Sequence, residues 1–138
     1  MIFGFTLVLA LVYGFIQLRR RILPDPNAAG MDANLALLGE GFLFFGLYHL
    51  VFFPSYYRDV NKVGVSFVKG SVFSAVFVAA DIVLCYTLPL MRDVLDTPDP
   101  QNLGAKLGFL AVSVAVYAAG TLLALRISQR RLEAQDIR

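Results

Sequence analysis

Apolar residues dominate four stretches of the chain, and charged residues or proline bound each of them. A helix needs about 20 mostly apolar residues to cross the hydrocarbon of a bilayer. Backbone in lipid must also satisfy its own hydrogen bonds, which favours helices over open strands. The pattern predicts membrane-spanning helices at residues 1–18, 34–53, 70–91 and 103–125. We expect an all-α fold, an integral membrane four-helix bundle that is multi-pass and forms a single domain over residues 1–138.

The two ends of the chain fit this interpretation. The first apolar stretch has no basic residues before it and no small-residue cleavage pattern after it, so we expect a retained helix and not a secretory signal. Residues 126–138 carry charges of both signs and predict a polar tail that extends the fourth helix into water. The segments between spans are too short to fold as a further domain.

Composition narrows the classes of function. Hydrophobic residues make up 58% of the chain and charged residues only 16%, against about 25% in soluble domains. The net charge of +2 comes from basic residues that flank the spans, so no nucleic-acid partner is expected. Cys85 is the only cysteine, which excludes an internal disulfide, a CxxC pair and a zinc cluster built on cysteines. No catalytic motif is present, and we expect neither enzymatic activity nor a metal site.

Two turns in the chain resemble each other. The segments "RRILPDPN" (Arg20–Asn27) and "RDVLDTPDPQN" (Arg92–Asn102) each precede an Asn-Leu pair and then a Gly-Phe-Leu triplet. One interpretation is a duplicated helical hairpin, with two copies in parallel orientation about an axis along the membrane normal. The other is that helix ends simply recruit Pro, Asp and Asn. In both, Asn34 and Asn102 are candidate N-caps of the second and fourth helices.

The Lys and Arg residues give a weak prediction of orientation. The side of the termini and the middle loop holds seven of them, Arg58, Lys62, Lys69, Arg126, Arg130, Arg131 and Arg138. The other side holds five, Arg19, Arg20, Arg21, Arg92 and Lys106. We expect cytoplasmic termini, although such near-balance also occurs in small transport proteins that insert both ways.

Small residues predict where the helices pack, because close approach of backbones drives helix association in lipid. Such residues recur on the third and fourth helices, at Ser71, Ala75, Ala79, Gly104, Gly108, Ala111, Ala115 and Ala119. We therefore expect these two helices to form the tightest pair. The second helix is rich in Phe, whose rings could face lipid, neighbouring helices, a partner subunit or a planar cofactor.

Three ionisable residues stand out inside the predicted spans, away from the span ends: Glu40, His49 and Asp81. Each costs about 2.5–3.5 kcal/mol at a helix centre on insertion scales, so such residues usually serve a function. We expect a proton or cation site, with Asp81 as its main residue and Glu40 or His49 assisting. The alternative is that each side chain only forms hydrogen bonds that hold helices together.

Helical geometry separates Glu40 from His49. Nine residues at 100° each place them on opposite faces of one helix. At about 1.5 Å per residue, Glu40, Asp81 and His49 lie roughly 9, 15 and 22 Å from the same end of the bundle. Asp81 is therefore close enough in height to contact either Glu40 or His49. Because those two residues lie on opposite faces of their helix, at most one of them contacts Asp81.

His49 also has a possible cofactor role. A six-coordinate haem needs two axial ligands, so a single histidine could serve only with a partner's ligand or as a one-ligand site. Chlorophyll ligation is possible on the same grounds. No cofactor is the default expectation, with haem or chlorophyll at His49 as the alternative.

Two functions from different classes follow. The first is an accessory or structural subunit of a larger energy-converting or transport complex, with the lipid bilayer and other membrane subunits, or copies of itself, as partners. The second is a homo-oligomeric channel or transporter that moves protons or a cation through Asp81. A subunit that anchors haem or a pigment through His49 is a third interpretation.

Overall fold

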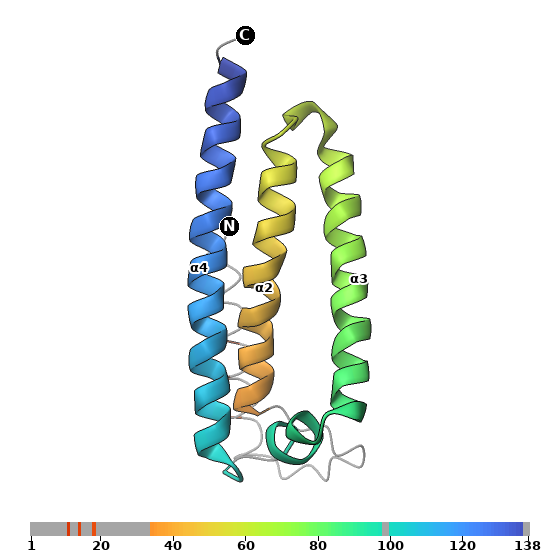
Figure 1. Ribbon diagram of the computed structural model, residues 1–138, viewed down its shortest axis with the longest axis vertical. Coiled ribbons are helices and arrows are strands. Elements are labelled where there is room, and N and C mark those ends of the chain that lie inside the picture. Colours follow the sequence, from red (N-terminus) through yellow and green to blue (C-terminus); the bar gives the residue numbers. More distant parts are fainter. Residues whose placement is uncertain (1–10, 12–13, 15–17, 19–33, 98–99, 137–138) are drawn as a thin grey trace.

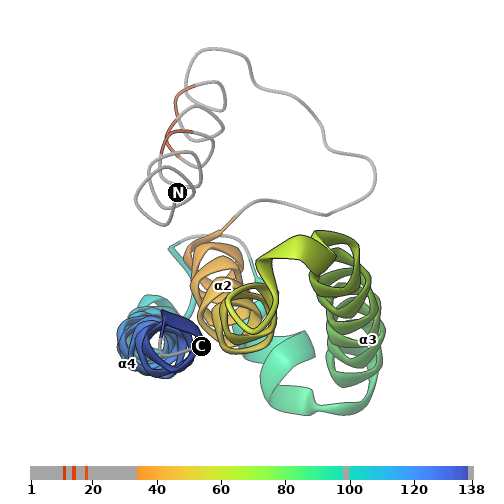
Figure 2. The same cartoon turned by 90° about the horizontal axis from the view of Figure 1, so that it is seen from above.

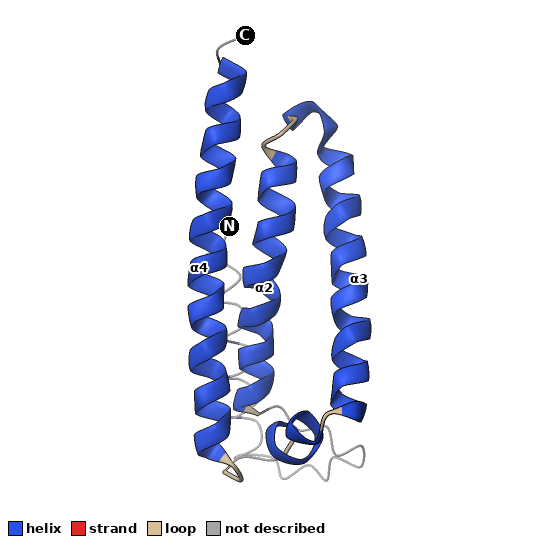
Figure 3. Cartoon of the chain, in the orientation of Figure 1, coloured by secondary structure: helices blue, strands red, loops and turns tan. Residues whose placement is uncertain are grey.

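The fold of the chain is known from a computed structural model, which describes Leu11, Gly14, Leu18, residues 34–97 and residues 100–136. Regular structure in this described part is entirely helical (Figure 3). Three long helices and two short helical turns follow in the order α2 (Leu35–Tyr56), η1 (Val60–Lys62), α3 (Val63–Thr87), η2 (Leu90–Leu95) and α4 (Leu103–Asp136). The all-α prediction is thus confirmed for the described residues. The span predicted at residues 1–18 falls outside them except at three positions.

Within the described residues, three helices are long and apolar enough to cross a membrane: Leu35–Tyr56, Val60–Thr87 and Leu103–Ala134. The second and fourth predicted spans begin within one residue of the observed helices. These lengths and compositions indicate an integral membrane protein.

The helix at the third predicted span has different bounds from that span, since α3 begins seven residues before residue 70 and ends four before residue 91. Its end has a clear cause. Leu88 precedes Pro89 and adopts φ −94°, ψ 117°, the extended conformation that a following proline imposes. Its start differs because Lys69 interrupts the apolar pattern of the sequence, whereas in the structure Lys69 lies inside the helix with its side chain exposed.

α2 lies between the other two long helices (Figures 1 and 2). It runs parallel to α4 and antiparallel to α3. α4 packs along α2 over much of its length, α3 packs less extensively on the other side of α2, and α3 and α4 hardly touch in the described part. The prediction that the third and fourth helices form the tightest pair is therefore wrong.

The close approach of α2 and α4 depends on glycines that face the partner helix. A Cβ added at Gly46 would lie 2.6 Å from the Cα atom of Tyr117, and one added at Gly120 would lie 2.6 Å from the carbonyl oxygen of Gly46. By contrast, Gly104 and Gly108 have nothing within 4 Å of such a Cβ. Gly104 and Gly108, which the sequence suggested as packing residues, thus lie away from α2, and Gly46 of α2 together with Gly120 of α4 allows the close approach.

Aromatic rings of α2 fill the remaining helix contacts. Phe44 lies against Phe73 and Phe77 of α3, with ring centroids 6.0 and 5.2 Å away. On the other side, the ring of Phe42 meets that of Tyr117 edge to face at 5.5 Å. These phenylalanines therefore serve helix packing, where edge-to-face pairs add to the burial of apolar area.

The α4 helix continues well beyond its apolar part. It runs to Asp136 without a break, so the apolar span and the polar segment after residue 125 form one helix. Arg131 donates a hydrogen bond to the carbonyl oxygen of Pro54, near the end of α2. This contact ties the polar end of α4 to the neighbouring helix.

The wide π-helical turn η2 brings the chain from α3 back toward α2 and α4. The N–H of Asp96 donates to the carbonyl of Met91, five residues earlier, at 2.8 Å. Arg92 and Asp93 form an exposed ion pair of 2.7 Å on this turn. Hydrogen bonds from the Arg92 guanidinium hold the pKa of Asp93 below its ordinary value.

Asn34 joins this turn to the start of α2. Its side-chain oxygen accepts from the N–H of Leu37 at 2.9 Å, which confirms the predicted N-cap. Its amide nitrogen donates to the carbonyls of Leu95 and Thr97 at 2.7 and 3.0 Å. Asn102, the other predicted cap, directly precedes α4 in a left-handed conformation (φ 53°), and its side chain makes a long 3.4 Å bond to Val94.

We expect the substitution Asn34→Ala to destabilise the protein by about 2 kcal/mol, since it removes a cap and two further hydrogen bonds from a buried side chain. The matched substitution Asn102→Ala is expected to cost less than about 1 kcal/mol. Unfolding in a denaturing detergent, followed by helix content, measures both. Equal losses for the two variants would show that Asn34 does no more than an ordinary turn residue.

Candidate functional site

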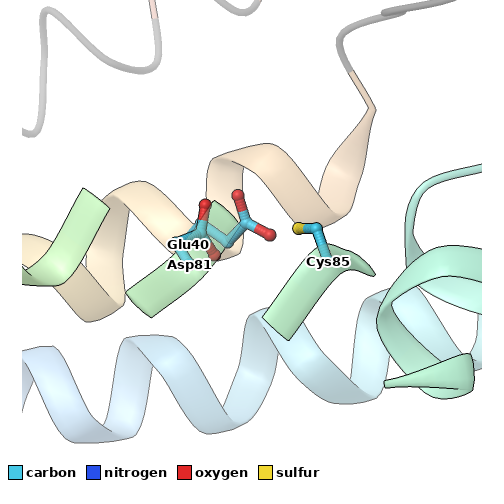
Figure 4. A group of neighbouring side chains, drawn as sticks. All are labelled: Glu40, Asp81 and Cys85. Atoms are coloured by element: carbon cyan, nitrogen blue, oxygen red, sulfur yellow. The ribbon is translucent and has the colours of Figure 1, made fainter. Parts of the chain in front are cut away.

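Glu40, Asp81 and Cys85 come together between α2 and α3. One carboxylate oxygen from each acid and the Cys85 sulfur all lie within 4.8 Å of one another. Figure 4 shows the two carboxylates side by side, with the Cys85 thiol pointing toward them. All three side chains are half-buried.

The geometry follows from helical spacing and chain direction. Asp81 and Cys85 are four residues apart on α3 and therefore share one face of that helix. Glu40 comes from the antiparallel α2. The rise per residue predicts that Glu40 and Asp81 lie within about one helical turn of each other along the bundle. The structure thus brings Glu40 and Asp81 together, as their depths allow.

These three side chains differ from the other polar groups of the long helices. Ser74 donates to the carbonyl of Gly70 at 2.9 Å, and Ser128 donates to that of Ala124 at 2.7 Å. In contrast, no hydrogen bond or ion pair within the described part of the chain reaches the side chain of Glu40, Asp81 or Cys85. Two acids and a thiol therefore face one another without a cationic or hydrogen-bonding partner there.

Close carboxyl groups outside bulk water constrain the chemistry of this site. Two negative charges at this separation repel strongly where the dielectric constant is low. A proton held between the groups, or a cation bound by both, removes that repulsion. Proton exchange and cation binding are therefore the two processes that the arrangement favours.

His49 lies elsewhere, on the face of α2 that packs against α4. Its Nδ1 atom is 2.9 Å from the Thr121 hydroxyl oxygen, and both side chains are buried. The rings of Phe53 and Tyr117 lie 5.1 and 5.7 Å from the imidazole. Glu40 and His49 are therefore on different faces, as predicted, and His49 takes no part in the cluster.

This environment gives His49 the role of a buried polar link between helices. Its hydrogen bond satisfies one ring nitrogen, and the rings of Phe53 and Tyr117 pack beside the imidazole. The Thr121 partner was missed from the sequence, because rotation of one helix against another cannot be deduced from a single chain.

We expect Thr121→Val to destabilise the protein by about 1–3 kcal/mol, because the buried imidazole loses its partner. The double substitution His49→Phe with Thr121→Val removes both polar groups, and we expect it to recover at least half of that loss. Detergent unfolding of the two variants tests the pair. A Thr121→Val protein as stable as the wild type would show that the bond contributes nothing.

Cys85 is the member of the cluster that the sequence did not identify. Counting cysteines suggested that a single one is uninformative, yet its spacing of four residues from Asp81 places both on one helical face. That spacing was the available signal. It gains meaning only with Glu40 opposite, which requires the packing of α3 on α2.

Comparison with known proteins adds no assignment: no family, no curated protein and no solved structure matches this chain.

Proposed function

We propose that this protein is a four-span integral membrane protein that transfers protons or a cation across the bilayer, with Glu40 and Asp81 as its transfer site. The observation that carries this proposal is the pairing of two carboxyl groups, without a cationic partner in the described residues, between two apolar helices. Ionisable groups inside spans are costly and typically mark ion or proton pathways. In this proposal the two carboxyl groups together take up a proton or cation, which removes the repulsion between them, and then release it.

The proposal extends to topology. In this proposal the termini lie in the cytoplasm and residues 1–18 form the first of the four spans. A relation between two parallel hairpins is supported by the two PDP turns and by the parallel course of α2 and α4. The second hairpin, α3 and α4, does not pack as a unit, since α4 packs against α2 and hardly contacts α3.

Vesicles reconstituted with the purified protein test the transfer function. An imposed pH or cation gradient should drive flux through the wild-type protein and not through vesicles that contain Asp81→Asn. Wild-type flux equal to that of protein-free vesicles, or an Asp81→Asn variant with undiminished flux, would overturn the proposal.

A second function, an accessory subunit of a larger membrane complex, is supported by the open surface of α3. Only Ser66 and Gly70 of this helix are buried, although it carries many large apolar side chains along its length. Partner subunits or further copies of the chain can cover such a surface, as lipid can. Purification in mild detergent decides: a single polypeptide of fixed small stoichiometry contradicts this function, and a constant set of other membrane proteins supports it.

A further inference from the structure

We propose that Glu40, Asp81 and Cys85 together bind a divalent transition-metal ion of the zinc class. This inference rests on the proposed transfer function and names the cation of the same site. It adds a third ligand, the Cys85 sulfur, that proton transfer between two carboxyl groups does not need. Two features carry it: the chemistry of the donor set, and the convergence of three side chains that have no other partner in the described part of the chain.

The donor set discriminates among cations. Magnesium and calcium prefer oxygen ligands alone. Thiolate sulfur favours zinc and other soft or borderline metals, and carboxylate oxygens serve the same ions at about 2.0–2.2 Å. A site with two oxygens and one sulfur therefore fits a transition metal better than an alkali or alkaline-earth ion.

The geometry is close to that of a three-ligand site. Ligand atoms around one tetrahedral zinc lie roughly 3.3–3.8 Å apart, given its bond lengths. The three atoms here lie within 4.8 Å of one another, so side-chain rotations that move each ligand atom by about 1 Å bring them around a common metal centre. Asp81 and Cys85 come from one rigid helical face and Glu40 from the opposite helix (Figure 4). Three protein ligands leave a fourth position for water or an exchanging ligand, as in open zinc sites.

Charge balance connects the metal to the proposed transfer. Two carboxylates and a thiolate carry three negative charges, and a divalent cation bound by all three reduces this net charge to −1, which lowers the cost of holding the site in an apolar span. Metal binding requires deprotonated ligands, so the ion displaces the protons that these groups held. Metal uptake at this site thus releases protons in exchange.

Cobalt(II) is the probe that tests the inference, because it replaces zinc and absorbs light when a thiolate binds it. The purified full-length protein in detergent, with a reduced thiol, should bind about one Co²⁺ with a thiolate-to-metal absorption band, and added Zn²⁺ should abolish the band. Cys85→Ser should remove the band, and both Cys85→Ser and Glu40→Gln should weaken Zn²⁺ binding at least about tenfold. Glu133→Gln, on the polar part of α4, is the control that should bind both metals as the wild type does.

Each outcome separates this inference from the function on which it rests. Zn²⁺ binding that is equally tight in the wild type and in Cys85→Ser overturns the metal site. Proton or alkali-cation flux that Asp81→Asn abolishes and Cys85→Ser leaves unchanged keeps the transfer function and overturns the metal as its cargo. Circular dichroism of every variant identifies any loss that arises from misfolding, and Cys85→Ala provides a second test of the sulfur.

Discussion

Replacing Gly46 by leucine should separate α2 from α4 and destabilise the protein by about 3 kcal/mol or more. The reason is that any Cβ at this position meets the backbone of Tyr117 at 2.6 Å, and a backbone cannot turn away as a flexible side chain can. The wild-type contact depends on that close approach, because packing rather than the hydrophobic effect holds helices together in lipid. Reversible unfolding in a denaturing detergent measures the loss.

Gly108→Leu provides the matched control for this prediction. It makes the same substitution in the partner helix at a position where a Cβ has nothing within 4 Å. Removal of a helical glycine there should leave stability unchanged or raise it by about 0.5–1 kcal/mol. If both variants lose stability equally, the tight α2–α4 interface is not what holds the described helices together.

The second large effect is expected at the carboxyl pair. Glu40→Gln and Asp81→Asn should each lower flux in reconstituted vesicles at least about tenfold, which corresponds to ~1.4 kcal/mol or more in the transfer barrier. Each amide keeps the size of the acid but can neither carry a proton nor bind a cation by charge. Removing either member should suffice, because the two groups share one site.

Two controls distinguish a loss of transfer from a loss of fold. Asp93→Asn removes an acid from the exposed turn η2 and should leave flux intact. The detergent stability of Glu40→Gln should equal or exceed that of the wild type, since the substitution relieves repulsion between neighbouring acids. Reduced flux together with reduced stability would instead indicate that the pair serves only the packing of α2 on α3.

The sequence was sufficient to predict the helical class, the starts of two spans and the N-cap at Asn34, because each depends on local chemistry. Continuous apolar runs predict helices in lipid, and an Asn before such a run caps it. The bounds of α3 were less accessible, since Lys69 lies inside the helix although it interrupts the apolar pattern, and the predicted span ran past Pro89 without regard to its effect on Leu88. The sequence could not predict which helices pack together. Gly46 and Gly120 lie at the contact, but in a single sequence nothing distinguishes them from the other small residues.

The candidate site was predicted in part. Helical phase correctly separated Glu40 from His49, and depth correctly allowed Glu40 to meet Asp81. The choice between the two neighbours of Asp81 required the rotation of α2, which places Glu40 toward α3 and His49 toward Thr121. Cys85 was overlooked because its relevance arises from the facing helix and not from a cysteine motif.

We infer that Glu40 and Asp81 form one site that holds a proton or a cation between apolar helices. Infrared difference spectroscopy of the protein in lipid tests it most directly, by comparing the carboxyl bands before and after a rise in pH or addition of cation. We expect a carboxyl signal in the wild type that disappears in Glu40→Gln and in Asp81→Asn alike. The same difference spectrum from the wild type and from a variant that carries both substitutions would contradict it.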